Sequence, residues 1–127
     1  MLVVLTIAEM RAELKTLYSL DVPDLEAWQP EDPECFALNV RAIIGPEGSE
    51  GEESFDVTIC TAAWLAQEPP PKGFEFLHSR ILVERWQYET VKRALGDLCV
   101  HTSGKNWIDI ANRLSRYMHW EFDDYRD

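Results

Sequence analysis

The chain has 127 residues, 46% of them apolar, with five Trp, five Phe and four Tyr, so it is long and apolar enough for one domain with a buried core. This composition excludes disorder for most of the chain, and no apolar run approaches the roughly 20 residues of a membrane-spanning helix. A net charge of −11 argues against nucleic acid and anionic membranes as partners, and favours basic protein surfaces.

The first residues are apolar, but we do not expect them to form an export signal. No basic region precedes them and no small-residue cleavage pattern follows, so we expect a cytoplasmic protein without membrane attachment. Residues 1–9 form either an extra edge strand or an extension that results from the choice of start codon. We favour the extension, with Met10 as the natural start, because a convincing strand pattern begins only there. We expect residues 1–127 to form a single domain, with residues 10–125 as its body.

A strand is expected over residues 10–19, and an ordered loop follows it. Residues 21–33 hold three prolines and five acids, a composition typical of a loop. Within that loop, Leu25 to Trp28 predict one helical turn, and Asp24 is suited to cap its N-terminus.

The clearest signal is an antiparallel hairpin. In residues 35–44 and again in residues 54–60, apolar and polar side chains alternate, as in strands with one buried face. The two runs are joined by residues 45–51, which contain three glycines. The apolar face of this hairpin needs a cover.

The second half of the chain supplies that cover. Thr61 is placed to cap a helix over residues 61–67, which the prolines at 69–71 end. Residues 74–84 resemble another strand. Its best candidates for burial are Leu77, Ile81 and Val83.

Two longer amphipathic helices are expected near the C-terminus. Apolar residues recur at intervals of three and four over residues 87–100 and again over residues 107–118. Strands first and helices later predict an α+β fold: a small antiparallel sheet with helices, mostly from the C-terminal half, packed on one face.

Cysteine and histidine spacing gives no sign of a metal or cofactor site. Three separated cysteines without a CxxC pair are expected to be buried free thiols in a reducing compartment, and a catalytic thiol paired with a histidine is the lesser alternative. The three histidines lack metal-ligand spacing. These residues are Cys35, Cys60, Cys99, His78, His101 and His119.

Acidic residues concentrate in two parts of the chain. Residues 21–56 hold eleven acids and a single base, Arg41, and the last seven residues are acidic again. Glu52, Glu53 and Asp56 stand at the start of a predicted strand, where Asp56 shares the non-core face with Glu52 and Glu53 points with Phe55. Three interpretations remain open: a partner-binding face, a solvated face, or the acid/base pair of a small hydrolase.

Two aromatic features accompany these acids. Trp28 lies in the acidic, proline-rich loop, and it is either a loop anchor or an exposed partner contact. At the C-terminus aromatic and acidic residues alternate from Trp120 to Tyr125, which predicts a short terminal strand or a tail docked by its aromatic side chains. Trp120 and Phe122 would then lie on one side, with Glu121 and Asp123 on the other.

The chain resembles immunity protein 8, a bacterial family, over nearly its whole length. The most specific motifs are Gly-Glu-Glu-Ser-Phe-Asp at residues 51–56 and Trp-Glu-Phe followed by Tyr at residues 120–125. Departures are the N-terminal extension and Ala62-Ala63, where a proline is expected near the Trp-Leu pair. The other resembling segments are residues 11–15, 21–25, 29–36, 45–50, 60–65 and 114–116.

The resemblance implies a cytoplasmic protein encoded beside a polymorphic toxin, which it binds and blocks without enzymatic activity or a cofactor. The acidic charge adds the expectation of a toxin domain with a basic surface. An acidic adaptor unrelated to toxins is the alternative, followed by the carboxylate-based hydrolase. The predicted partner-binding residues are Trp28, Glu52, Glu53, Asp56, Glu121, Asp123 and Asp124.

Overall fold

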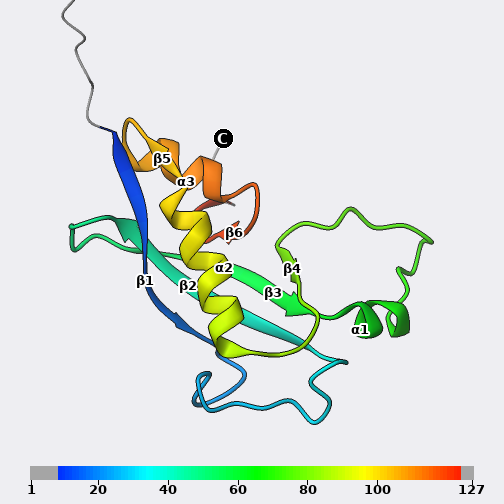
Figure 1. The fold of residues 1–127 in the computed structure, drawn as a ribbon. Helices are drawn as coiled ribbons and strands as arrows, with labels where there is room; N and C mark the ends of the chain where they lie inside the picture. The colour runs from blue at the N-terminus through cyan, green and yellow to red at the C-terminus, as the bar shows by residue number, and fades with distance from the viewer. Residues whose placement is uncertain (1–8, 124–127) are drawn as a thin grey trace, which may run out of the picture.

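A computed structural model describes residues 9–123, which form a curled sheet with three helices (Figure 1). In this part of the chain, no helix is long and apolar enough to cross a membrane. The elements in chain order are β1 (Met10–Tyr18), β2 (Ala37–Pro46), β3 (Glu53–Cys60), α1 (Ala62–Gln67), β4 (Arg80–Leu82), α2 (Tyr88–Val100), β5 (Ser103–Gly104), α3 (Trp107–Leu114) and β6 (His119–Trp120).

The sheet has the order β4-β3-β2-β1-β5, and β6 pairs with β3 beside β4. The predicted hairpin is confirmed, since β2 and β3 pair antiparallel from Ala37 opposite Cys60 to Ile44 opposite Glu53. Only β4 runs parallel to its neighbour β3 among the described strands, so the sheet is mixed but largely antiparallel. The α+β prediction is confirmed.

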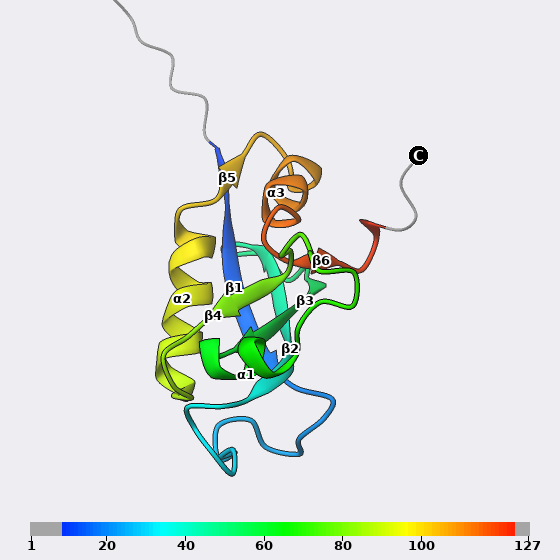
Figure 2. The ribbon, with the colours of Figure 1, turned by 90° about the vertical axis from the view of Figure 1, so that its right-hand side faces the viewer.

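Both long helices cover the same face of the sheet. Alternation along β2 and β3 turns residues such as Ala42 and Phe55 inward, where both are fully buried. They share one core with Leu95 of α2 and Ile110 of α3. The side view shows α2 lying along this face (Figure 2). By contrast, α1 buries none of its residues and stands beside the sheet.

Two glycines with opposite surroundings give a matched test of this packing. A Cβ on Gly45 would lie 1.8 Å from the backbone oxygen of Gly51, whereas one on Gly96, inside α2, meets nothing within 4 Å. Gly45→Ala should therefore lower the free energy of unfolding by about 1–3 kcal/mol, because the hairpin ends must separate. Gly96→Ala should raise it by about 0.5–1 kcal/mol, because alanine loses less backbone entropy in a helix. Urea denaturation checks both, and equal effects of the two changes would contradict the account.

The strand expected over residues 74–84 is mostly wrong. Only Arg80–Leu82 pairs with β3, and Leu77 is 63% exposed although Val83 is buried as expected. The cause is competition for the edge of β3, because β6 occupies Phe55 and Asp56 and leaves only Thr58 to Cys60 for β4.

The helix expected over residues 107–118 ends early, at Leu114. Beyond it the backbone tightens, with Arg116 N donating to Arg113 O (3.3 Å) and Tyr117 N to Leu114 O (3.0 Å). Such i→i+3 bonds are typical of a closing helical turn, and they direct the chain into β6. The capping prediction for Thr61 is confirmed, since its side chain accepts a hydrogen bond from Trp64 N.

Candidate functional site

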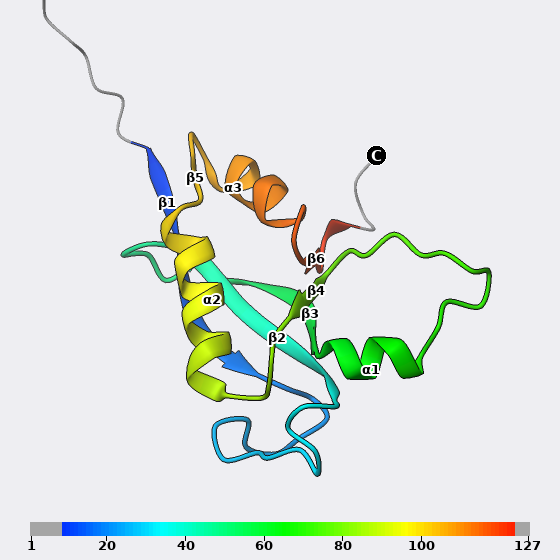
Figure 3. The same cartoon turned by 45° about the vertical axis from the view of Figure 1, so that its right-hand side comes forward.

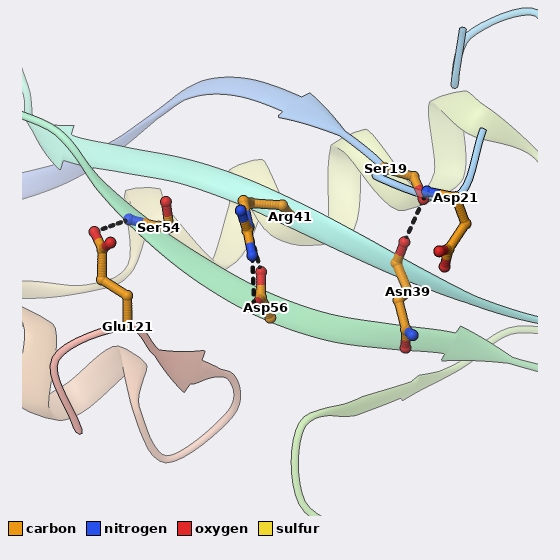
Figure 4. Close-up of polar contacts among 7 residues, drawn as sticks. All are labelled: Ser19, Asp21, Asn39, Arg41, Ser54, Asp56 and Glu121. Carbon is orange, nitrogen blue, oxygen red and sulfur yellow. Dashed lines mark hydrogen bonds and ion pairs between the residues drawn. The ribbon is translucent and has the colours of Figure 1, made fainter. Parts of the chain in front are cut away.

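The face of the sheet opposite the helices carries polar side chains. The registers place Arg41 opposite both Tyr18 of β1 and Asp56 of β3, and Asp56 opposite His119 of β6. Alternation directs these side chains away from the core, and Figure 4 shows Arg41 and Asp56 among them. We call this surface the open face; its residues are Tyr18, Asn39, Arg41, Ser54, Asp56, Thr58 and His119.

An ion pair lies at the centre of the open face. Arg41 Nε and Nη2 donate to the two carboxylate oxygens of Asp56, at 2.8 and 3.2 Å (Figure 4). The hydrogen bond to Asp56 and, with a smaller effect, a hydrogen bond to Tyr18 raise the pKa of Arg41. The guanidinium therefore stays charged at any accessible pH. This two-point geometry fixes both side chains and offsets the charge of Asp56.

A hollow of about 370 Å³ opens beside this pair. Near one end, Ser19 Oγ donates to Asn39 O (2.6 Å) and accepts from Asp21 N (3.1 Å), which holds the start of the acidic loop against the sheet (Figure 4). Charged, amide, hydroxyl and apolar groups all line the hollow. The residues that line it include Leu20, Asp21, Asn39, Arg41, Asp56, Thr58, Ser79 and His119.

The two acidic parts of the chain meet at the pairing of β3 with β6. Ser54 N donates to Glu121 Oε1 (2.7 Å), and Glu121 N donates to Ser54 O (3.1 Å). Trp120 Nε1 donates to Glu53 Oε2 (2.6 Å). Glu52 stands exposed just before β3. We call Glu52 and Glu121 the acidic rim of the open face. Glu53 points with Phe55 toward the other face, and its role in partner binding stays a prediction.

The hairpin carboxylates do not converge on one pocket. Asp56 lines the hollow and is bound by Arg41, whereas Glu53 holds the indole of Trp120, and neither Glu52 nor Glu53 lines the hollow. A carboxylate pair for general acid/base work needs both groups in one cleft. This geometry therefore gives the hydrolase interpretation no support.

Trp28 packs within an aromatic cluster away from the hollow. Its ring meets Trp86 edge-on at 4.9 Å and Phe36 at 6.0 Å, and its backbone oxygen accepts a hydrogen bond from Trp86 Nε1 (3.0 Å). These are the contacts of a loop anchor, the first of the two interpretations. A role of its partly buried ring in partner binding stays a prediction.

The C-terminal segment is placed as far as Asp123. Trp120 is 3% exposed and stacks on Phe55, and Phe122 meets Trp120 edge-on at 5.9 Å, so the aromatic side chains dock this segment. Asp123 is half-exposed next to the acidic rim. Asp124, the last of the predicted contact residues, lies outside the described residues.

Comparison with known families identifies the chain. The family model for immunity protein 8 matches residues 12–125, which is most of the sequence. The chain belongs to the immunity protein 8 family. Searches of curated proteins and of solved structures find no match. The matched part of this chain contains the whole open face and the acidic rim.

Sequence reasoning missed part of this immunity protein 8 surface. Tyr18, Asn39 and His119 line or border the hollow but were not among the predicted contact residues. A signal was present, since Asn39 and Arg41 already stood on the polar side of an alternating strand. What the pattern lacked was the register that sets these residues beside Asp56.

The cysteines of this family member are free thiols with different access. Burial raises the pKa of Cys99 from its ordinary 9.0 to about 12, and burial also raises the pKa of Cys60, while Cys35 is only partly buried. A disulfide-exchange reagent at pH 8 should label Cys35 rapidly and the other two only after unfolding. Counting fast and slow thiols in the native protein tests this, and three fast thiols would contradict it.

The same shift predicts a loss of stability in alkali. Well below pH 9 the Cys99 thiol is neutral in both the folded and the unfolded chain and adds no pH dependence. Between pH 9 and about 12 the unfolded chain releases the proton while the folded one retains it, so stability falls as the pH rises. Cys99→Ala should flatten this part of the pH profile of urea denaturation, and an unchanged slope would refute the assignment.

Proposed function

We propose that this chain binds and neutralises the toxin domain of a cognate bacterial polymorphic toxin, and thereby protects the producing cell. The proposal rests on membership of the immunity protein 8 family. The chain acts by occupying a surface of the toxin, with no chemistry of its own. Its contact surface in this proposal is the open face with the acidic rim, extended by Asp123 and Asp124.

The observation that carries the choice of surface is the meeting of β3 with β6. Two acidic segments far apart in the chain lie there side by side, with Glu121 bound to the backbone of Ser54. In a chain with net charge −11, such a rim attracts basic surfaces and speeds their encounter. The partner surface proposed here is therefore a basic cleft or patch of the toxin domain.

The members of this surface contribute unequally. Asp56 is offset by Arg41, and Glu53 is only partly exposed and points with Phe55. The exposed carboxylates of Glu52 and Glu121 therefore carry most of the long-range attraction. Asp56 and Arg41 instead present a fixed pair of charges. Such a pair helps to set the orientation of the bound partner more than it adds to the affinity.

A growth-rescue experiment tests the proposal. The C-terminal domain of the large protein encoded immediately upstream is induced in a host, with and without this chain. Restored growth together with co-purification of the two proteins is expected. A lethal domain that this chain neither binds nor relieves would contradict neutralisation of that toxin and favour an adaptor role.

A further inference from the structure

Residues 69–79, between α1 and β4, form a loop that projects away from the sheet (Figures 1 and 3). We call this segment the aromatic loop. Phe74 is 66% exposed, Phe76 92% and Leu77 63%, so three large apolar side chains stand in water within four consecutive positions. Single exposed apolar side chains are normal on protein surfaces, but a concentration of them marks an interaction site.

The tip of the aromatic loop is held in shape. The rings of Phe74 and Phe76 contact edge-on, with centroids 6.5 Å apart. Between them in sequence, Glu75 forms an ion pair with Arg80 at 2.7 Å. Before them, Gly73 has a φ of +83°, which glycine adopts without strain, and its amide donates to Pro70 O (3.0 Å). A preformed loop loses less conformational entropy when it binds.

The base of the loop is fixed beside the open face. His78 Nε2 lies 2.8 Å from Ser115 O, and His78 Nδ1 lies 2.9 Å from Ser79 Oγ. Ser79 O accepts a hydrogen bond from Thr58 N of β3 (2.8 Å), and Ser79 also lines the hollow. The aromatic loop is thus continuous with the proposed toxin-binding surface.

We propose that the aromatic loop inserts Phe74, Phe76 and Leu77 into an apolar cleft of the toxin domain next to the basic surface that the acidic rim meets. The inference rests on the proposed function and divides the interface into two parts. The acidic rim speeds encounter, and the aromatic loop slows dissociation, because buried aromatic anchors dominate interface energies.

Charge decides between a toxin and a second copy of this chain as the occupant. Two copies would each bring a net charge of −11 to the contact, so they would repel each other. Such repulsion opposes self-association, whereas a basic partner removes it. The loop also projects from the body, a shape suited to a concave cleft (Figure 3).

The test uses the full chain and a toxin domain whose growth inhibition the wild-type chain relieves. In surface plasmon resonance, Phe74→Ala/Phe76→Ala should raise the dissociation rate about tenfold or more and leave the association rate within about twofold. Phe76→Leu keeps an apolar side chain and should dissociate more slowly than the double alanine variant. Thermal melting should be unchanged, since both rings are exposed.

Ile108→Ala is the matched control, because Ile108 is 56% exposed on α3, outside the aromatic loop. A double variant that dissociates no faster than Ile108→Ala, while the wild type still binds and rescues, would overturn the inference and leave the proposed function intact. Failure of the wild type itself would instead overturn the proposed function. Sedimentation velocity of the chain alone gives a further outcome: a dimer that Phe76→Ala converts to a monomer would make the loop a self-interface and also overturn the inference.

Discussion

Replacing Phe55 with alanine is expected to lower the free energy of unfolding by about 3–5 kcal/mol. Phe55 is 0% exposed, stacks on Trp120 at 6.4 Å and meets Trp107 edge-on at 6.3 Å, so it joins β3, β6 and α3 in one core. Its truncation would leave a cavity where these three elements meet. Because small domains are stable by only about 5–15 kcal/mol, this loss is a large fraction of the whole.

Urea denaturation followed by tryptophan fluorescence measures this effect. Phe76→Ala is the control, since the same change at a 92% exposed position should alter stability by less than about 0.5 kcal/mol. Among the variants that remain folded, Phe76→Ala should weaken toxin binding more than Phe55→Ala does. A Phe55→Ala protein as stable as the Phe76→Ala protein would contradict the described core.

Reversing the charge of the acidic rim should give the largest change in association rate. Glu52→Lys/Glu121→Lys is expected to lower the association rate with the toxin domain about tenfold or more at low ionic strength, because steering by opposite charges is lost. Near 1 M salt the difference should nearly vanish, since the screening length falls to about 3 Å. Stopped-flow kinetics over a salt series measures it.

Glu89→Lys/Asp97→Lys is the matched control on α2, which covers the other face of the sheet. Each double variant replaces two exposed acids with two lysines, so the change in net charge is the same. Thermal melting confirms that both remain folded, which matters because Glu121 also binds Ser54 N. If the two variants slow association equally, only net charge matters, and the acidic rim is not the docking surface.

The sequence predicted the elements that are determined by residues close together in the chain. Alternation over β2 and β3 and the helical period over α2 each depend on neighbours along the chain, and these elements lie where expected. The strand over residues 74–84 failed for a non-local reason, because β6 competes with β4 for the edge of β3. No local sequence pattern indicates that two strands will compete for one edge.

The candidate site shows the same division. The concentration of acids on residues 52–56 and at the C-terminus was readable from composition, and their proximity follows from β3 pairing with β6. The internal partners of these acids were not readable. These partners depend on strand register and on the reach of side chains across strands. Arg41 offsets Asp56, and Glu53 accepts a hydrogen bond from the indole of Trp120.

The aromatic loop illustrates a further limit. Residues 74–84 resembled a strand, with Leu77 among the candidates for burial, but Leu77, Phe74 and Phe76 are all exposed. Three prolines at residues 69–71 and Gly73 precede this segment, and they favour a loop. Hydrophobic residues that serve a partner interface and those that serve a core look the same in a single sequence.

Hydrogen–deuterium exchange of the chain with and without its toxin domain would show which face of the sheet the toxin binds. We expect slower exchange on binding in β6, in the loop before β3 and in residues 69–79, with α2 unchanged. Protection confined to α2, with the open face and the aromatic loop unaffected, would contradict this expectation, because the toxin would then bind the helical side of the sheet.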